Sequence, residues 1–153
     1  YYITMYLDFI KNTLYTQTMY AEFESYIHDA AENNKQLNAL VLNDKWSMLL
    51  KKYYGDDFEV DPLSMVGWAR IPHFYNSFYV YKYATGCCSA VTCAQDILKN
   101  GPENYLNFLK KGGSDYPLNL LKCNNVDLNS QKPIKNTIDK FDQLVNELEK
   151  LLS

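Results

Sequence analysis

The stretch that decides the fold class is YYITMYLDFIKNTLYTQTMYAEFESYIHDAAEN, residues 1–33. No glycine or proline interrupts it, and its apolar side chains recur at steps of three and four residues, which is the spacing of one face of an α-helix. Together with Thr13 and Gln17, which continue the spacing, that face comprises Tyr6, Phe9, Ile10, Leu14, Tyr20, Phe23 and Ile27. The sequence therefore predicts one long helix over about residues 1–33.

The rest of the chain shows shorter segments of the same kind, separated by turn residues. Glycine follows three of these segments, at Gly55, Gly101 and Gly112. The least regular stretch runs from Asp56 to Pro72, and one helical turn is expected over about residues 63–69, between Pro62 and Pro72. No alternating run of apolar and polar residues indicates a strand. We expect an all-α domain of about six helices, the later five over about residues 37–54, 74–100, 102–111, 116–123 and 133–152.

Length and composition bound the class of protein. With 153 residues, the chain is long enough for one domain with its own core. Hydrophobic residues make up 47% and aromatic residues 15%, which excludes a wholly disordered chain. The net charge is −3, so we expect no nucleic-acid partner. No apolar run approaches the roughly 18 residues of a membrane span, so we expect no membrane partner either.

The four cysteines, Cys87, Cys88, Cys93 and Cys123, show no metal-site pattern. No C-x-x-C pair or other zinc-ligand spacing is present. We interpret them as small buried thiols in a reducing cytoplasm, which is the compartment that we expect for this protein.

One face of the first helix could be interpreted as a metal site. Glu24, His28 and Glu32 are spaced four residues apart and share this face. The end of the helix is polar throughout, however, and a solvated face explains the pattern better. The zinc-peptidase pattern H-E-x-x-H is also absent, so we expect no metal ligand in the chain.

The segment richest in candidate chemistry is WARIPHFYNSFYVYKYATG, Trp68 to Gly86. A tyrosine hydroxyl is a hydrogen-bond donor on a rigid ring. Such a donor stabilises a carbonyl oxygen that becomes negative in a transition state. The segment is therefore a candidate for substrate binding and for electrostatic catalysis.

Helical spacing limits which side chains of this segment act together. Tyr75, Tyr79 and Tyr83 share one stripe if the segment is helical, and His73 can then face the same cleft as Tyr81. If His73 lies in the loop before the helix, this geometry does not restrict it. On spacing alone, an aromatic stripe is more often core packing than a site, so both interpretations stay open.

Several blocks of the sequence together resemble a known family. The blocks are TLYTQTMYAEFE (residues 13–24), KKYYG (51–55), WARIPHFYNSFYVYKYATG (68–86) and FLKKGGSDYPLNLLK (108–122). In this order, and with the terminal helix, they resemble oligoendopeptidase F, of the thimet-oligopeptidase superfamily of zinc metallopeptidases. The resemblance covers nearly the whole chain.

The resemblance implies that residues 1–153 form the C-terminal helical part of a zincin-type catalytic lobe that lines a deep cleft. Such enzymes hold zinc with the two histidines of H-E-x-x-H and a downstream glutamate. These ligands are expected upstream of Tyr1, so the 153 residues alone are expected to bind no zinc and to be inactive. The substrate is expected to be a short peptide, and the upstream zinc-binding part of the same polypeptide is the expected partner.

The resemblance also implies roles for four residues of the aromatic segment. Tyr81 is the expected donor to the oxyanion, and His73 the expected substrate-binding histidine. Tyr75 is the expected second tyrosine of the substrate site, and Tyr79 is a further candidate. The alternative is a non-catalytic helical module that binds a peptide or a protein partner through the same aromatic segment.

Overall fold

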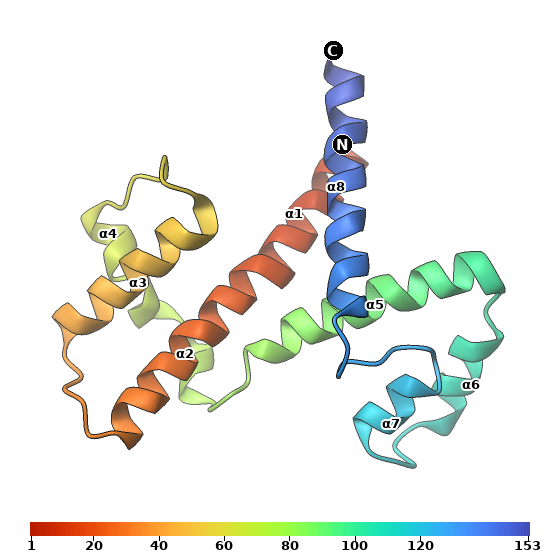
Figure 1. The fold of residues 1–153 in the computed structure, drawn as a ribbon, viewed down its shortest axis with the longest axis horizontal. Helices are drawn as coiled ribbons and strands as arrows, with labels where there is room; N and C mark the ends of the chain where they lie inside the picture. The colour runs from red at the N-terminus through yellow and green to blue at the C-terminus, as the bar shows by residue number, and fades with distance from the viewer. The chain divides into compact units, whose positions relative to one another are not determined.

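The computed structural model describes residues 1–153 and consists of helices joined by turns, without any strand (Figure 1). The predicted all-α fold class is therefore confirmed. Contacts between residues divide the chain into two compact units. The first unit comprises residues 1–14 and 85–153, and the second comprises residues 15–84.

The predicted first helix is present, with one irregularity that the sequence did not indicate. Helices α1 (Tyr2–Ile10) and α2 (Thr16–Glu32) follow one another through a π-helical stretch, Lys11–Tyr15. The helical segment thus covers almost the whole predicted range. A π-helix adds one residue to a turn and is common at functional sites.

The first unit consists of α1 packed along α8 (Lys132–Leu152), together with α6 (Glu103–Lys111), α7 (Pro117–Lys122) and α5 (Tyr81–Asn100) from residue 85 onward. Its buried side chains are mostly small or aliphatic: Ile10, Leu14, Cys87, Cys88, Val91, Cys93, Leu120, Val126 and Leu144. Small residues of this kind let helices approach closely.

The thiol prediction is confirmed for three of the four cysteines. Cys87, Cys88 and Cys93 are buried and unpaired, and burial raises the pKa of the Cys87 thiol to about 11. The prediction is wrong for Cys123, which is exposed because it directly follows the short helix α7. There the Lys111 Nζ donates a hydrogen bond to the Cys123 Sγ at 2.9 Å.

The second unit contains α2, α3 (Ala39–Tyr54), α4 (Pro62–Met65) and two 3₁₀ helices, Gly67–Arg70 and Pro72–Tyr75. The predicted turn over residues 63–69 is therefore divided between α4 and the first 3₁₀ helix. The hydrophobic core of this unit consists of Met19, Phe23, Trp46, Leu49, Leu50 and Ile71. It is richer in aromatic rings than the core of the first unit.

Side-chain caps explain where two helices of the second unit begin. The Asn38 side chain accepts a hydrogen bond from the Val41 N–H at 3.0 Å, at the first turn of α3. Asp61 accepts one from the Ser64 N–H at 2.6 Å, which lowers the pKa of the Asp61 carboxyl group. Both caps follow the sequence preference for Asn and Asp at helix starts.

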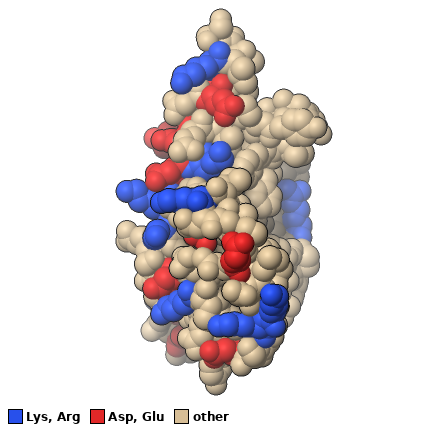
Figure 2. Space-filling model, turned by 90° about the vertical axis from the view of Figure 1, so that its right-hand side faces the viewer, with Lys and Arg blue, Asp and Glu red and all other residues tan.

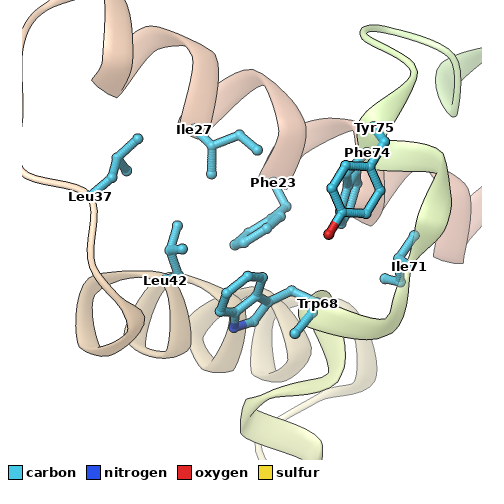
Figure 3. A pocket seen from close by; sticks show the side chains of 9 residues that line it. Phe23, Ile27, Leu37, Leu42, Trp68, Ile71, Phe74 and Tyr75 are labelled. Carbon is cyan, nitrogen blue, oxygen red and sulfur yellow. The ribbon is translucent and has the colours of Figure 1, made fainter.

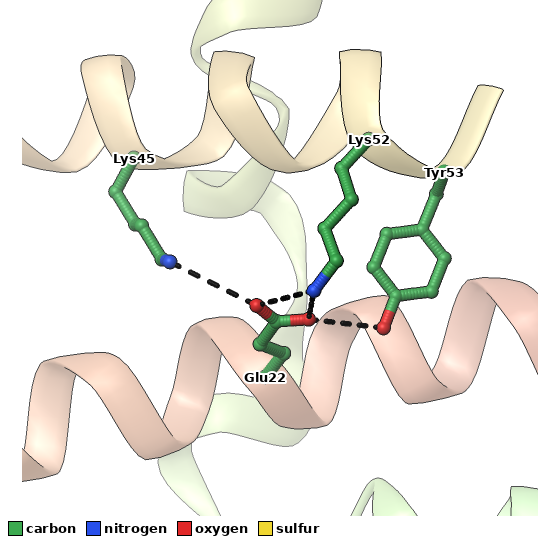
Figure 4. Close-up of polar contacts among 4 residues, drawn as sticks. All are labelled: Glu22, Lys45, Lys52 and Tyr53. Atoms are coloured by element: carbon green, nitrogen blue, oxygen red, sulfur yellow. Dashed lines mark hydrogen bonds and ion pairs between the residues drawn. The ribbon is translucent and has the colours of Figure 1, made fainter. Parts of the chain in front are cut away.

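A polar cluster joins α2 to α3 (Figure 4). Glu22 on α2 accepts hydrogen bonds from the Lys52 Nζ at 2.7 and 3.0 Å and from the Tyr53 hydroxyl at 3.0 Å. The Lys45 Nζ lies 3.9 Å from the same carboxylate. Burial, followed by the hydrogen bond to Glu22, raises the pKa of Tyr53 to about 12. The cluster links these two helices beside the aromatic core of the second unit.

On the face shown in Figure 2, basic and acidic side chains are interspersed and form no large patch of one charge. No helix combines the length and the hydropathy that crossing a bilayer requires.

The long helix predicted over residues 74–100 begins later than expected. Helix α5 ends at Asn100 as predicted but starts at Tyr81, and residues 72–75 form a separate 3₁₀ helix. The reason is Phe78, whose φ of 55° is incompatible with a continuous right-handed helix. A hydrogen bond from outside the segment stabilises this conformation, as described below.

Candidate functional site

Three aromatic rings of the predicted segment meet in the second unit. His73 lies on the 3₁₀ helix Pro72–Tyr75, Tyr79 in the turn after it, and Tyr83 in the first turn of α5. The His73 ring stacks with that of Tyr79 at 5.9 Å and meets that of Tyr83 edge-on at 5.6 Å. The two tyrosine rings are 5.6 Å apart and also edge-on. We call His73, Tyr79 and Tyr83 the aromatic cluster.

The polar atoms of the aromatic cluster are hydrogen-bonded to one another. The His73 Nε2 and the Tyr83 hydroxyl oxygen are 3.2 Å apart. A hydrogen bond with Tyr79, followed by partial burial, raises the pKa of Tyr83, so its hydroxyl keeps its proton at neutral pH. The Lys82 Nζ lies over the Tyr79 ring, 5.1 Å from its centre. Each ring therefore restricts the others, which leaves rigid polar groups near the surface.

The remaining two predicted residues, Tyr81 and Tyr75, are not members of the aromatic cluster as defined above. Tyr81 is the first residue of α5 and its side chain is 48% exposed. Tyr75 is the last residue of the 3₁₀ helix and is 90% exposed. The structure thus brings together His73 and Tyr79 of the four predicted residues, and it adds Tyr83.

The helical arithmetic for this segment is wrong, because Tyr75 and Tyr79 precede α5. Tyr79 and Tyr83 still meet, through the turn rather than along a helix face. The expected alignment of His73 with Tyr81 required both residues to be helical in one element, and it does not apply. The sequence pattern indicated Tyr83 only as a member of the tyrosine stripe. Its contact with His73 could not be predicted from the spacing of neighbouring residues.

The core-packing interpretation is wrong for the stripe of Tyr75, Tyr79 and Tyr83, none of which belongs to the hydrophobic core, whereas Phe74 of the same segment packs against that core. The Phe74 ring packs on that of Phe23, with ring centres 5.4 Å apart. Tyr75, Tyr81 and Tyr83 are exposed and lie outside the core.

An apolar pocket lies next to this segment in the second unit (Figure 3). Its volume is about 240 Å³, and a dry cavity of roughly 150 Å³ already accommodates benzene. Figure 3 shows side chains from α2, from the start of α3 and from the two 3₁₀ helices converging on it. They are Phe23, Ile27, Leu37, Leu42, Trp68, Ala69, Ile71, Phe74 and Tyr75. The pocket has room for one apolar side chain.

The structure corrects the solvated-face interpretation of Glu24, His28 and Glu32. Glu32 is exposed, but Glu24 is 1% exposed and His28 is half-buried. The Glu24 Oε1 accepts a hydrogen bond from the Phe78 N–H at 2.7 Å, and the His28 ring lies 4.4 Å from that of Phe78. The end of α2 is therefore partly an internal face that contacts the aromatic segment.

The chain does not fit a zinc centre of its own. No group of three or more His, Cys, Asp or Glu side chains is placed to hold a metal ion. The two histidines lie on different elements and contact aromatic rings.

Comparison with known proteins gives the family. A model of peptidase family M3 matches residues 5–140. The chain belongs to peptidase family M3. The resemblance to oligoendopeptidase F that the sequence blocks indicated is thus confirmed.

Members of this family are similar to the chain over nearly all of its length. The chain is 40% identical over 149 residues to the oligopeptidase PepF of *Bacillus subtilis*, which is 95% of this chain and 22% of that protein. It is 41% identical over 148 residues to an oligoendopeptidase F homolog of *Borreliella burgdorferi*, covering 95% of this chain and 25% of the homolog.

A solved structure gives the same result for the fold. The crystal structure of oligoendopeptidase-F from *Enterococcus faecium* matches with a TM-score of 0.94 and 41% identity, over 98% of this chain and 29% of that chain. The chain therefore has the fold of a helical part of such proteins, and it spans only between 22% and 29% of the length of these relatives.

Proposed function

We propose that this chain is the C-terminal helical part, residues 1–153, of a zinc metalloendopeptidase that hydrolyses short peptides. In this proposal it forms the wall of the cleft that binds the substrate and stabilises the oxyanion. The observation that carries the proposal is the aromatic cluster in a chain of family M3, because it holds hydrogen-bonding groups rigidly near the surface.

The proposed roles follow the exposure and the contacts of each side chain. Tyr81, half-exposed in the first turn of α5, donates a hydrogen bond to the substrate carbonyl oxygen as that oxygen gains negative charge. His73 binds the substrate near this carbonyl group, with its ring held by Tyr79. Tyr75 contacts the substrate at the edge of the apolar pocket that it lines.

Zinc in this proposal is bound by the upstream part of the same polypeptide, because the side chains of residues 1–153 do not fit a zinc site. The 153 residues alone are then expected to be inactive. The four unpaired cysteines are typical of a reducing compartment, so we propose the cytoplasm as the location.

The test compares the 153-residue chain with a longer polypeptide that also contains the upstream part. We expect the longer polypeptide to contain one zinc ion and to hydrolyse a quenched fluorescent peptide, and the 153-residue chain to do neither. Strong hydrolysis by the 153 residues alone would contradict the division of roles. Peptide binding by a longer polypeptide that contains zinc but hydrolyses nothing would favour the non-catalytic binding module instead.

A further inference from the structure

Glu24 on α2 is the only acidic or basic side chain in the buried part of the molecule, at 1% exposure. Burying a carboxyl group is unfavourable unless hydrogen bonds replace its contacts with water. Such a residue therefore has a specific partner, and its partner shows what it does.

The partner of Glu24 is one backbone amide in the aromatic segment. The Glu24 Oε1 accepts a hydrogen bond from the Phe78 N–H at 2.7 Å, between residues 54 positions apart in the sequence. Phe78 has a φ of 55°, a conformation that is strained for a bulky side chain. The hydrogen bond thus stabilises the backbone at the point where it departs from helical geometry.

A second contact from the same face of α2 holds the side chain of Phe78. His28 lies one helical turn after Glu24, and its ring is 4.4 Å from the Phe78 ring with an angle of 32° between the planes. Glu24 and His28 together therefore fix both the backbone and the ring of Phe78.

Phe78 lies between the elements that carry His73 and the tyrosines, so the contact of Glu24 with Phe78 affects how these side chains are placed. The 3₁₀ helix with His73 ends three residues before it, Tyr79 follows it directly, and α5 begins at Tyr81. The direction of the chain at Phe78 therefore determines where the tyrosine hydroxyls lie relative to the His73 ring.

We propose that Glu24 is a positioning residue whose carboxyl group fixes the left-handed turn at Phe78 and so places the tyrosines of the aromatic segment relative to His73. This inference rests on the proposed function. Glu24 itself does not touch the substrate, because it is fully buried. It acts through Phe78, and a displacement of about 1 Å in a catalytic group lowers a rate by roughly a hundredfold.

The first half of the test uses the 153-residue chain and amide hydrogen exchange measured by NMR. Glu24→Gln keeps an acceptor oxygen at this position. Glu24→Leu introduces an apolar side chain of similar size, which has no acceptor. We expect the Phe78 amide to exchange at least about tenfold faster in Glu24→Leu than in the unchanged chain or in Glu24→Gln. Equal exchange in all three proteins would overturn the inference.

His28→Ala keeps this test decisive if Glu24→Leu does not fold. It removes the ring that packs on Phe78 but leaves the buried core of α2 unchanged. Faster exchange at Phe78, with unchanged exchange at the core residue Leu49, supports the fixed turn. An unchanged Phe78 amide would contradict it.

The second half uses the longer polypeptide with its zinc-binding part. We expect Glu24→Leu to lower kcat by about a hundredfold with little change in KM or in zinc content, and Glu24→Gln to restore most of the rate. A variant Glu24→Leu with full kcat would overturn the positioning role, and so would Glu24→Gln as slow as Glu24→Leu. If the longer polypeptide without any substitution hydrolyses no peptide, that result contradicts the proposed function instead. The exchange rate of the Phe78 amide would still decide whether Glu24 fixes the turn.

Discussion

The two compact units differ in how their interiors are built. The interior of the second unit contains directed polar contacts between distant segments, such as Glu24 with Phe78 and the Trp68 indole N–H with the Asn43 side chain. The interior of the first unit consists mainly of thiols and aliphatic side chains, and it also contains directed contacts, such as the hydrogen bond that the Asn124 side-chain amide donates to a buried thiol. The two interiors thus differ in their content of aromatic rings, which is higher in the second unit. The aromatic cluster also lies in the second unit, and the difference between the interiors can be measured in each unit.

The largest expected effect concerns thiol reactivity in the first unit. Cys123 is exposed, whereas Cys87, Cys88 and Cys93 are buried. A disulfide reagent at neutral pH is expected to label one thiol quickly and three more slowly by on the order of a thousandfold or more, because the buried thiols react only after local opening. Cys123→Ser should remove the fast phase alone. Two or more fast thiols in the unchanged chain would show that this interior is loosely packed.

The next effect concerns the aromatic core of the second unit. Phe23 is buried and contacts Trp46 and Trp68, which are the two tryptophans of the chain. Phe23→Ala is expected to lower the free energy of unfolding by about 3–5 kcal/mol, because it leaves a cavity among rings that cannot close it. Urea unfolding followed by tryptophan fluorescence measures this, since both tryptophans report on the second unit.

The matched control is Leu98→Ala on α5, where the side chain is 88% exposed. It should change the free energy of unfolding by less than about 0.5 kcal/mol. A loss for Phe23→Ala no larger than that of this control would contradict the location of the core.

A smaller effect tests one directed contact. The Trp68 Nε1 donates a hydrogen bond to the Asn43 Oδ1 at 2.8 Å. Removing either partner is expected to cost about 1 kcal/mol or somewhat more, because the other is left without its hydrogen bond in a half-buried place. A double-mutant cycle of Trp68→Phe and Asn43→Ala should give a coupling energy of about 0.5–1.5 kcal/mol. Additive losses would mean that the contact is absent in solution.

The smallest expected effect is the pH dependence of the Glu22 cluster. The hydrogen bond from Lys52 lowers the pKa of Glu22 in the folded chain. The unfolded chain therefore takes up the proton at higher pH, so this contribution is complete above about pH 5 and is lost as the pH falls through the lowered pKa. Glu22→Gln should reduce the loss of unfolding free energy at acid pH by less than about 1 kcal/mol, because the ion pair of Glu22 with Lys52 is partly exposed. If the free energy of unfolding falls equally with pH in both proteins below about pH 5, the lowered pKa of Glu22 is contradicted.

Much of the fold could be predicted because periodicity and end signals are local. Helix α3 begins after Asn38 and ends at Tyr54 before Gly55, and α8 follows its apolar repeat to Leu152. These features depend on residues a few positions apart. The identity of the family was also readable, because the blocks that carry it are contiguous.

The start of α5 and the burial of Glu24 could not be predicted, because both involve residues that are far apart in the sequence. Residues 74–80 have helical spacing, but the positive φ at Phe78, whose N–H donates a hydrogen bond to Glu24, interrupts the helix before Tyr81. The polar neighbours of Glu24 on α2 suggested a solvated face, and nothing local indicates a partner 54 residues away. For the same reason the contact of Tyr83 with His73 was visible only in the structure.

The central claim is that the Tyr81 hydroxyl stabilises the oxyanion of a peptide substrate, and kcat of a longer polypeptide with the Tyr81→Phe change tests it most directly. The substitution removes one hydroxyl group and keeps the ring. We expect kcat to fall by on the order of a hundredfold or more while KM and zinc content stay nearly unchanged. Tyr116→Phe, at an exposed tyrosine of the first unit, should leave kcat unaffected. Full turnover in Tyr81→Phe would contradict the claim.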